Sequence, residues 1–291
     1  MGGVVVRSLD AELEGKMSRA VEARRGDVSV MATVGEEKGQ AGALSTVWWG
    51  YRVDATLITE PTRLTLVPAQ VGSLVFRLSD SGRSALAAVR GEGVSALEKL
   101  LPIFEDLTKP KEERRVALSY PLYVGMRNKV PINVSVVCVG NWASTVPESL
   151  VAEGRIGLIL GEEIEFFRAM VAGRIAAVAE HDPWLKGNAP KLEWFGGQFT
   201  PAEVPSDASI CEALKRAHEL ATREEPTIEG IPCGADMRLF IRFGDMPCVM
   251  YGARDMNVAH APDEHISVTE LLTAASTLAC LLADWCGVDE N

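Results

Sequence analysis

Two short apolar segments with a small-residue segment between them constrain the fold of this chain most. Residues 27–34 (DVSVMATV) and 55–59 (ATLIT) each have the pattern of a strand, and residues 39–50 (GQAGALSTVWWG) fit a short helix. Strands that are apolar almost throughout are typical of a parallel sheet buried on both faces. The order strand, helix, strand therefore predicts an α/β sheet with right-handed crossovers.

The pattern changes after Pro68, where polar residues begin to alternate with apolar ones. Strands are expected at 71–78, 132–139, 156–160 and 191–195, and helices at about 94–107 and 162–179. Alternation of this kind suits a sheet that is covered on one face only. We therefore expect three segments: 1–67 and 201–291 form the α/β domain, and 68–200 form a separate α+β unit inserted into it.

The last part of the chain predicts two more helices. One is expected at 210–221, and the other begins at the capping box formed by Ser267 and Glu270. Apolar residues then recur at helical spacing, and Gly287 provides the stop.

Composition excludes several classes of function. The net charge is -11, and Lys and Arg are scattered, so the basic stripe of a nucleic-acid-binding protein is missing. We find no apolar run long enough to span a membrane and no signal peptide, because Arg7 and Asp10 interrupt the first residues. The six cysteines form no CxxC pair and read as reduced thiols. We therefore expect a cytoplasmic protein that binds neither nucleic acid nor membrane.

Acidic residues and one histidine follow predicted strands at the point where each strand ends. Glu36 and Glu37 follow residues 27–34, Glu60 follows 55–59, and His260 lies in the loop after a short strand at 247–251. Each alone also fits ordinary structure: a solvated turn, a strand end before proline, a surface loop. Together they would bring three carboxylates and an imidazole to one sheet edge, which is the pattern of a metal site.

Three motifs resemble a known family in order and spacing. They are 34–43 (VGEEKGQAGA), 58–62 (ITEPT) and 251–264 (YGARDMNVAHAPDE). They look like the motifs of the two-zinc amidohydrolases and metallopeptidases that include acetylornithine deacetylase, succinyl-diaminopimelate desuccinylase and carboxypeptidase G. The resemblance implies a zinc-peptidase-like sheet with helices on both faces. It also implies that 68–200 is an inserted lid through which two copies form a homodimer.

The resemblance also implies roles for single residues. Glu36 would be the general base, Glu37 and His260 would bind one metal ion, and Glu60 would bind the other. Two zinc ions, with cobalt as an alternative metal, would activate water for hydrolysis of a small N-acyl amino acid or peptide. Asn141 and Arg155 lie in stretches similar to the family's lid, and they are candidates to hold a substrate carboxylate. Ordinary lid structure is the alternative for both.

Two departures from the family pattern leave the activity open. Residues 1–5 (MGGVV) look like the end of the family's bridging-aspartate stretch, and its His-x-Asp motif has no counterpart. The chain also reads as starting on the first turn of a helix near Leu9, so we expect an N-terminally truncated, incomplete sheet and a second metal ion that is weakly held or absent. Leu86 stands where the family has a lid histidine that stabilises the oxyanion.

Three functions follow from these observations. The first is a metal-dependent hydrolase that deacylates an N-acyl amino acid, as acetylornithine deacetylase does. The second is a truncated, catalytically inactive relative that only dimerises or binds a ligand. The third is a plain α/β binding domain whose acidic residues are incidental.

Overall fold

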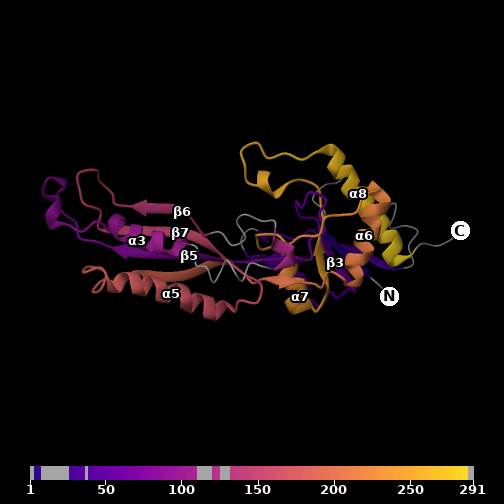
Figure 1. Cartoon of the computed structure of the whole chain (residues 1–291), viewed down its shortest axis with the longest axis horizontal. Coiled ribbons are helices and arrows are strands. Elements are labelled where there is room, and N and C mark those ends of the chain that lie inside the picture. The colour runs from indigo at the N-terminus through magenta and orange to yellow at the C-terminus, as the bar shows by residue number, and fades with distance from the viewer. Residues whose placement is uncertain (1–2, 8–25, 37–38, 110–119, 125–131, 288–291) are drawn as a thin grey trace. The chain divides into compact units, whose positions relative to one another are not determined.

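The chain consists of two compact units. The computed structural model describes residues 3–7, 26–36, 39–109, 120–124 and 132–287 (Figure 1). Unit 1 comprises Met1–Gln70, Pro121–Tyr123 and Ala202–Asn291, and unit 2 comprises Val71–Tyr120 and Val124–Pro201. The α/β domain and the inserted unit had been expected to divide after residues 67 and 200. The assignment of the inserted unit as a lid and dimerisation domain stays a prediction.

The described sheet of unit 1 is parallel. Its strands, in spatial order, are β10 (Cys248–Met250), β3 (Ala55–Ile58), β1 (Gly3–Arg7) and β2 (Asp27–Val30). All three neighbouring pairs are parallel. The α/β class predicted from the strand, helix, strand order is confirmed.

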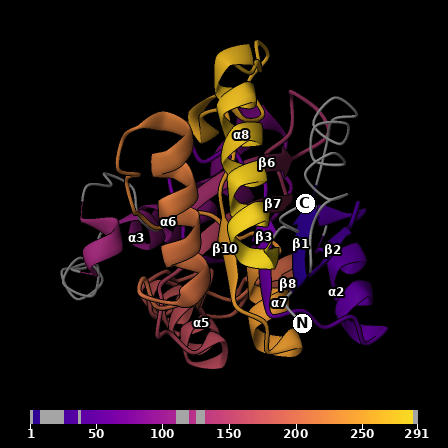
Figure 2. The same ribbon diagram turned by 90° about the vertical axis from the view of Figure 1, so that its right-hand side faces the viewer.

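Helices cover both faces of this sheet at β3, whose apolar residues pack on both sides. Ala55 and Leu57 of β3 pack with α6 (Ser209–Thr222) and α8 (Val268–Cys286). Ile58 packs on the opposite face with α2 (Ala41–Trp48) and α7 (Met237–Gly244). Figure 2 shows α6 and α8 lying side by side across β10 and β3.

The N-terminal expectation was wrong in two respects. Residues 3–7 form β1, a strand between β3 and β2, and not the first turn of a helix. Three consecutive valines explain this, since β-branched residues favour strands. The helix expected near Leu9 falls in 8–25, outside the described residues. The strand expected at 27–34 ends at Val30, which is 45% exposed because β2 is an edge of the described sheet.

Only one of the two hydrogen bonds expected for the α8 capping box is present. The Ser267 side chain accepts a hydrogen bond from the Glu270 N–H at 3.4 Å. The Glu270 carboxylate, however, accepts from the Arg254 N–H at 2.9 Å, so it ties a distant loop to α8. By length and composition alone α8 is apolar enough to cross a membrane, contrary to our expectation for this chain. One of its faces packs against α6 and the sheet.

Unit 2 is an antiparallel sheet with two helices on one face. The strand order is β6 (Ile132–Val139), β7 (Ser149–Leu158), β5 (Gly72–Ser81) and β8 (Lys191–Phe199). The helices α3 (Ala96–Thr108) and α5 (Ile164–Glu180) pack on β5 and β7 in one apolar core. The one-sided sheet is confirmed. Strand β7, however, starts at Ser149, well before the expected residue 156.

Short elements complete the two units. Unit 1 has the antiparallel pair β4 (Ala69–Gln70) and β9 (Ala202–Glu203) and the 3-10 turns η3 (Pro121–Tyr123) and η4 (Met256–Val258), and unit 2 has η2 (Ala87–Glu92).

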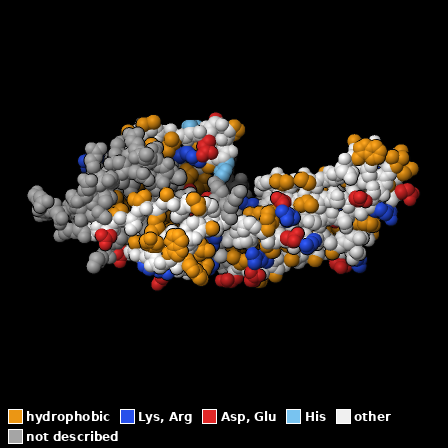
Figure 3. Space-filling view, turned by 180° about the vertical axis from the view of Figure 1, so that it is seen from behind, with side chains coloured by type: hydrophobic (Ala, Val, Ile, Leu, Met, Phe, Trp, Pro, Cys, Tyr) orange, Lys and Arg blue, Asp and Glu red, His pale blue; other side chains and the backbone are white. Residues whose placement is uncertain are grey.

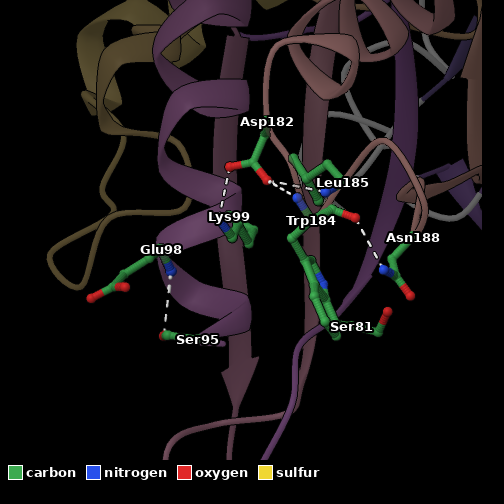
Figure 4. A network of polar contacts seen from close by, with 8 residues as sticks. All are labelled: Ser81, Ser95, Glu98, Lys99, Asp182, Trp184, Leu185 and Asn188. Carbon is green, nitrogen blue, oxygen red and sulfur yellow. Dashed lines mark hydrogen bonds and ion pairs between the residues drawn. The ribbon is translucent and has the colours of Figure 1, made fainter. Parts of the chain in front are cut away.

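A polar network joins α3 of unit 2 to the turn after α5 (Figure 4). The Lys99 ammonium contacts the Asp182 carboxylate at 2.7 Å. Asp182 also accepts from the N–H groups of Trp184 at 2.8 Å and Leu185 at 3.0 Å. Burial raises the pKa of Asp182, but these hydrogen bonds outweigh it and lower the pKa overall. The network therefore holds a charged carboxylate at the end of α5.

Candidate functional site

The candidate residues of unit 1 follow strands that all end at one edge of the sheet. Glu36 follows β2, Glu60 follows β3, and the loop leading to His260 follows β10. Because the strands are parallel, their carboxyl ends share this edge, where ligands bind in open α/β sheets. Strands β3 and β10 are neighbours, whereas β1 separates β3 from β2.

The loop after β10 starts directly beside Glu60. A Cβ atom on Gly252 would overlap the carbonyl oxygen of Glu60, so only glycine fits there. The Gly252 carbonyl accepts from the Leu64 N–H at 2.9 Å, and the Gly252 N–H donates to the Thr62 hydroxyl at 3.0 Å. The segment that carries Glu60 and the loop that leads to His260 are therefore joined at their origins.

His260 occupies the left-handed backbone region. Its φ is 61°, which is uncommon outside glycine. Its N–H donates to the Glu264 carboxylate at 3.0 Å, and the other oxygen of Glu264 pairs with the Arg254 guanidinium. The imidazole is exposed. A charged pair thus supports the backbone on which this imidazole stands.

Glu36 lies in a tight turn that leads into α2. Gly35, Gly39 and Gln40 all have positive φ, at 76°, 111° and 66°. The Gln40 side chain is fully buried at the start of α2, and its amide donates to the Glu36 carboxylate at 3.3 Å. The turn therefore directs the Glu36 carboxylate back toward α2. Glu37 lies outside the described residues.

A buried polar network fixes the end of β10. The Tyr251 hydroxyl lies 2.7 Å from Nδ1 of His218 on α6 and 3.2 Å from the Thr277 hydroxyl on α8. Burial lowers the pKa of His218 and raises the pKa of Tyr251 to about 12. Both side chains are therefore neutral, and they anchor the strand from which the His260 loop departs.

The two candidates in unit 2 do not lie together. Arg155 is on β7, and its Nε donates to the Ser73 hydroxyl on β5. Asn141 is exposed in the turn after β6, next to the start of β7 at Ser149. Arg155 lies six positions after Ser149 along the extended strand, about 20 Å at the usual rise per residue. Within one chain they do not converge on one carboxylate. Leu86, before η2, is 55% exposed.

Sequence reasoning missed the residues that support the site. Gln40, Arg254 and Glu264 lie within the three motifs, but the sequence assigned them no role. Their contacts depend on backbone turns with positive φ. Asp236 was also not among the predicted site residues. It is buried at the start of α7 and accepts from the Thr33 hydroxyl at 3.4 Å.

Comparison with known proteins decides the family. Residues 16–284 match the peptidase family M20/M25/M40. This chain belongs to that family. The M20 family comprises metallo-hydrolases that act on amide bonds, so the chain's resemblance to acetylornithine deacetylase and succinyl-diaminopimelate desuccinylase is confirmed at the family level.

Individual relatives differ in what they act on. This M20 chain is 25% identical over 279 residues to an N-formyl-4-amino-5-aminomethyl-2-methylpyrimidine deformylase of Bacillus subtilis, an alignment that covers 90% of the chain and 65% of the relative. It is 24% identical over 293 residues to acetylornithine deacetylase of Myxococcus xanthus, covering 98% and 70%. The chain thus spans about two thirds of the length of these curated relatives.

A solved structure supports the fold of this M20 chain. The M20 family metallo-carboxypeptidase Sso-CP2 from Sulfolobus solfataricus superposes with a TM-score of 0.69 at 12% identity, over 97% of this chain and 84% of that one. Likeness at this identity shows the fold, which is the predicted zinc-peptidase-like sheet with an inserted unit.

Family membership implies that a divalent metal ion is used. The donors at the sheet edge, carboxylates and an imidazole, fit such an ion chemically. Among the residues that the structure describes, however, no three His, Cys, Asp or Glu side chains form a group able to hold one. Glu37, Glu60 and His260 as ligands and Glu36 as base therefore stay predictions.

Proposed function

We propose that this chain hydrolyses the amide bond of a small N-acyl compound with bound divalent metal ions, of which zinc is the first candidate. The observation that carries the proposal is that the loops of Glu36, Glu60 and His260 leave one edge of a parallel sheet. Glu37 and His260 would hold one ion and Glu60 the other. Such ions, when bound, polarise the amide carbonyl and lower the pKa of water.

Within this proposal Glu36 moves the proton. Its carboxylate takes a proton from the attacking water and delivers it to the leaving amine. Gln40 donates a hydrogen bond to one Glu36 oxygen, and this contact orients the carboxylate. The amide is split into a carboxylate and a free amine.

The first substrate class is an N-acyl amine without a carboxylate, such as an N-formyl aminomethylpyrimidine. The name of the Bacillus relative supports it. The charges beside this edge also support this class. Two described arginines there already have acidic partners: Arg63 pairs with Glu229 at 3.1 Å, and Arg254 pairs with Glu264. A substrate carboxylate would compete with these pairs. The second class is an N-acyl amino acid, supported by the Myxococcus relative.

The test is turnover by the purified chain supplied with zinc or cobalt. The substrates are N-formyl-4-amino-5-aminomethyl-2-methylpyrimidine, N-acetylornithine and an N-succinyl amino acid, assayed for release of the free amine. We expect the formyl compound to be cleaved fastest, and Glu36→Gln to lower kcat by about 100-fold or more. His181→Ala, an exposed histidine of unit 2, is the control. Absence of turnover with all three, in metal-loaded protein, would favour the inactive, ligand-binding relative.

We also propose a homodimer formed through unit 2. Strand β6 is an edge of the described sheet and exposes Val136, Val137 and Val139 by 46%, 45% and 38%. Helix α3 exposes a further apolar stripe, Leu97, Leu101 and Phe104. Both units carry exposed hydrophobic side chains, as Figure 3 shows on one face. An open apolar edge strand is a template for pairing with a second chain.

Sedimentation velocity tests the dimer. Val137→Lys places a charge on the β6 edge and is expected to shift the chain to monomer. Leu220→Lys changes an exposed leucine, 58% exposed on α6 of unit 1, and should leave the dimer intact. A wild-type chain that sediments as a monomer at micromolar concentration would contradict the proposal.

The cytoplasm is the proposed compartment. All six cysteines are free thiols, which supports a reducing environment. Thiol counting by mass spectrometry on protein from native cells would contradict this if it detected disulfides.

A further inference from the structure

We propose that Arg254 and Glu264 act as a positioning pair that sets where the His260 imidazole lies. The inference rests on the proposed function, in which His260 is a metal ligand. Neither residue touches the substrate in this view. Their role is to hold the loop between β10 and α8 in one conformation.

The Glu264 carboxylate closes this loop on itself. One oxygen accepts the His260 N–H at 3.0 Å, and the other pairs with the Arg254 guanidinium. The Glu264 N–H donates in turn to the Ala261 carbonyl at 3.2 Å. A single side chain therefore links the residue that bears the imidazole to the beginning of the loop.

Arg254 is itself fixed from two directions. Its N–H donates to the Glu270 carboxylate in the first turn of α8 at 2.9 Å. Its carbonyl accepts from the N–H of Arg63, three residues after Glu60, at 2.9 Å. The pair thus connects the His260 backbone to the segment that carries Glu60. Displacement of one candidate ligand relative to the other would break these contacts.

Backbone strain at this sheet edge also supports the positioning role. Arg63, Leu64, Arg254 and His260 have φ of 56°, 60°, 78° and 61°, in the left-handed region that non-glycine residues avoid. Such conformations persist only where surrounding contacts enforce them, and they gather at functional sites. Here Arg254 contacts Arg63 and Glu264 contacts His260, whereas the Gly252 carbonyl holds Leu64.

The Arg254–Glu264 ion pair is expected to affect the position of the loop more than the stability of the fold. The side chains are 24% and 40% exposed, a setting in which ion pairs contribute little to unfolding free energy. The Nε of Arg254 is buried and has no hydrogen-bond partner among the described residues, and the guanidinium pairs with the Glu264 carboxylate. Loss of the pair should therefore alter the loop while the fold remains.

Cobalt(II) binding by the full chain tests the inference, with affinity and visible absorption as readouts. Outer-shell partners of a metal ligand typically change affinity by about 10- to 100-fold. We expect a loss of that size, with a changed spectrum, for Glu264→Ala and for Arg254→Met, and little change in the denaturation midpoint. Asp284→Asn removes the charge of Asp284 in the more exposed Arg216–Asp284 pair of unit 1 and should leave cobalt binding unchanged.

Two further variants separate the outcomes. The swap Arg254→Glu/Glu264→Arg restores an ion pair but removes the acceptor of the His260 N–H, so it should not recover cobalt affinity, and recovery would overturn the inference. His260→Ala reports on the proposed function. If it weakens cobalt binding while Glu264→Ala does not, the positioning role is wrong and the ligand role stands. If His260→Ala changes nothing, both fail.

Discussion

Asp80 is a carboxylate that the fold buries, although burial disfavours its charged form. It lies on β5 of unit 2, is 6% exposed, and accepts the Ser81 N–H at 2.8 Å through one oxygen. The other oxygen is buried and has no hydrogen-bond partner in the part of the chain that the structure describes. Burial raises the pKa of Asp80 to about 6, while Lys99 opposes and Asp182 adds to this rise.

Replacing Asp80 should therefore change how stability depends on pH. A carboxyl whose pKa is raised from 3.8 to about 6 on folding stabilises the fold fully below pH 3.8, and this contribution is lost as pH rises through 6. The loss is at most about 3 kcal/mol. We expect Asp80→Asn to be more stable than wild type at pH 7.5 and nearly equal at pH 4, in denaturant unfolding.

The control for this prediction is Asp284→Asn, which alters an exposed carboxylate on α8. A difference between Asp80→Asn and wild type that is the same at both pH values would contradict the titration argument.

Gly252 makes a second prediction at the scale of single residues. A Cβ atom there would overlap the backbone of Glu60, which cannot move without displacing the end of β3. Overpacking of this kind costs about 1–3 kcal/mol. We expect Gly252→Ala to lower the unfolding free energy by that amount. Gly173→Ala on α5, where nothing lies near the added Cβ, should stabilise slightly. Equal effects would contradict the close approach.

At the scale of elements, the Tyr251 hydroxyl links the end of β10 to α6 and α8. Tyr251→Phe would leave His218 and Thr277 without the oxygen that both contact. A buried polar group that loses its partner costs about 1–3 kcal/mol. We expect Tyr251→Phe to lower the unfolding free energy by about 2 kcal/mol, measured by urea denaturation. Tyr51→Phe, at a 51% exposed tyrosine, should have almost no effect and serves as control.

Strand β7 shows how an element can escape sequence patterns. Gly154 lies inside it, and glycine in a strand interior weakens the strand pattern. The backbone of Gly154 lies against the Phe76 ring of β5 and the Asn133 carbonyl of β6, so a Cβ would collide with both. The glycine is needed for close approach between strands, which local sequence does not reveal.

For the whole molecule, metal binding and folding should be linked. An ion that binds only the folded state stabilises it by RT ln(1 + [L]/Kd), about 2.7 kcal/mol at a concentration 100 times Kd. We expect zinc to raise the thermal midpoint and a chelator to reverse the rise. His260→Ala should abolish most of this shift, and His181→Ala should retain it. A zinc effect equal in both variants would exclude His260 as a ligand.

Local patterns determined much of unit 1 and unit 2 from sequence alone. Apolar periodicity placed α2, α3, α5, α6 and α8 and strands β3, β5 and β6 within a few residues, because burial repeats with the period of each element. The parallel order also predicted that Glu36, Glu60 and His260 follow strands that end at one edge. The three motifs indicated the family.

Tertiary structure decided what surrounds those residues. The Gln40 contact with Glu36, the link from Glu264 to Arg254 and the exclusion of any side chain at Gly252 all arise in loops. The first two contacts lie within turns whose backbone angles are partly left-handed, and the third joins segments that are 190 positions apart in the chain. Sequence periodicity reports which face of an element is buried. It carries no information on contacts that exist only once separate loops have been brought together.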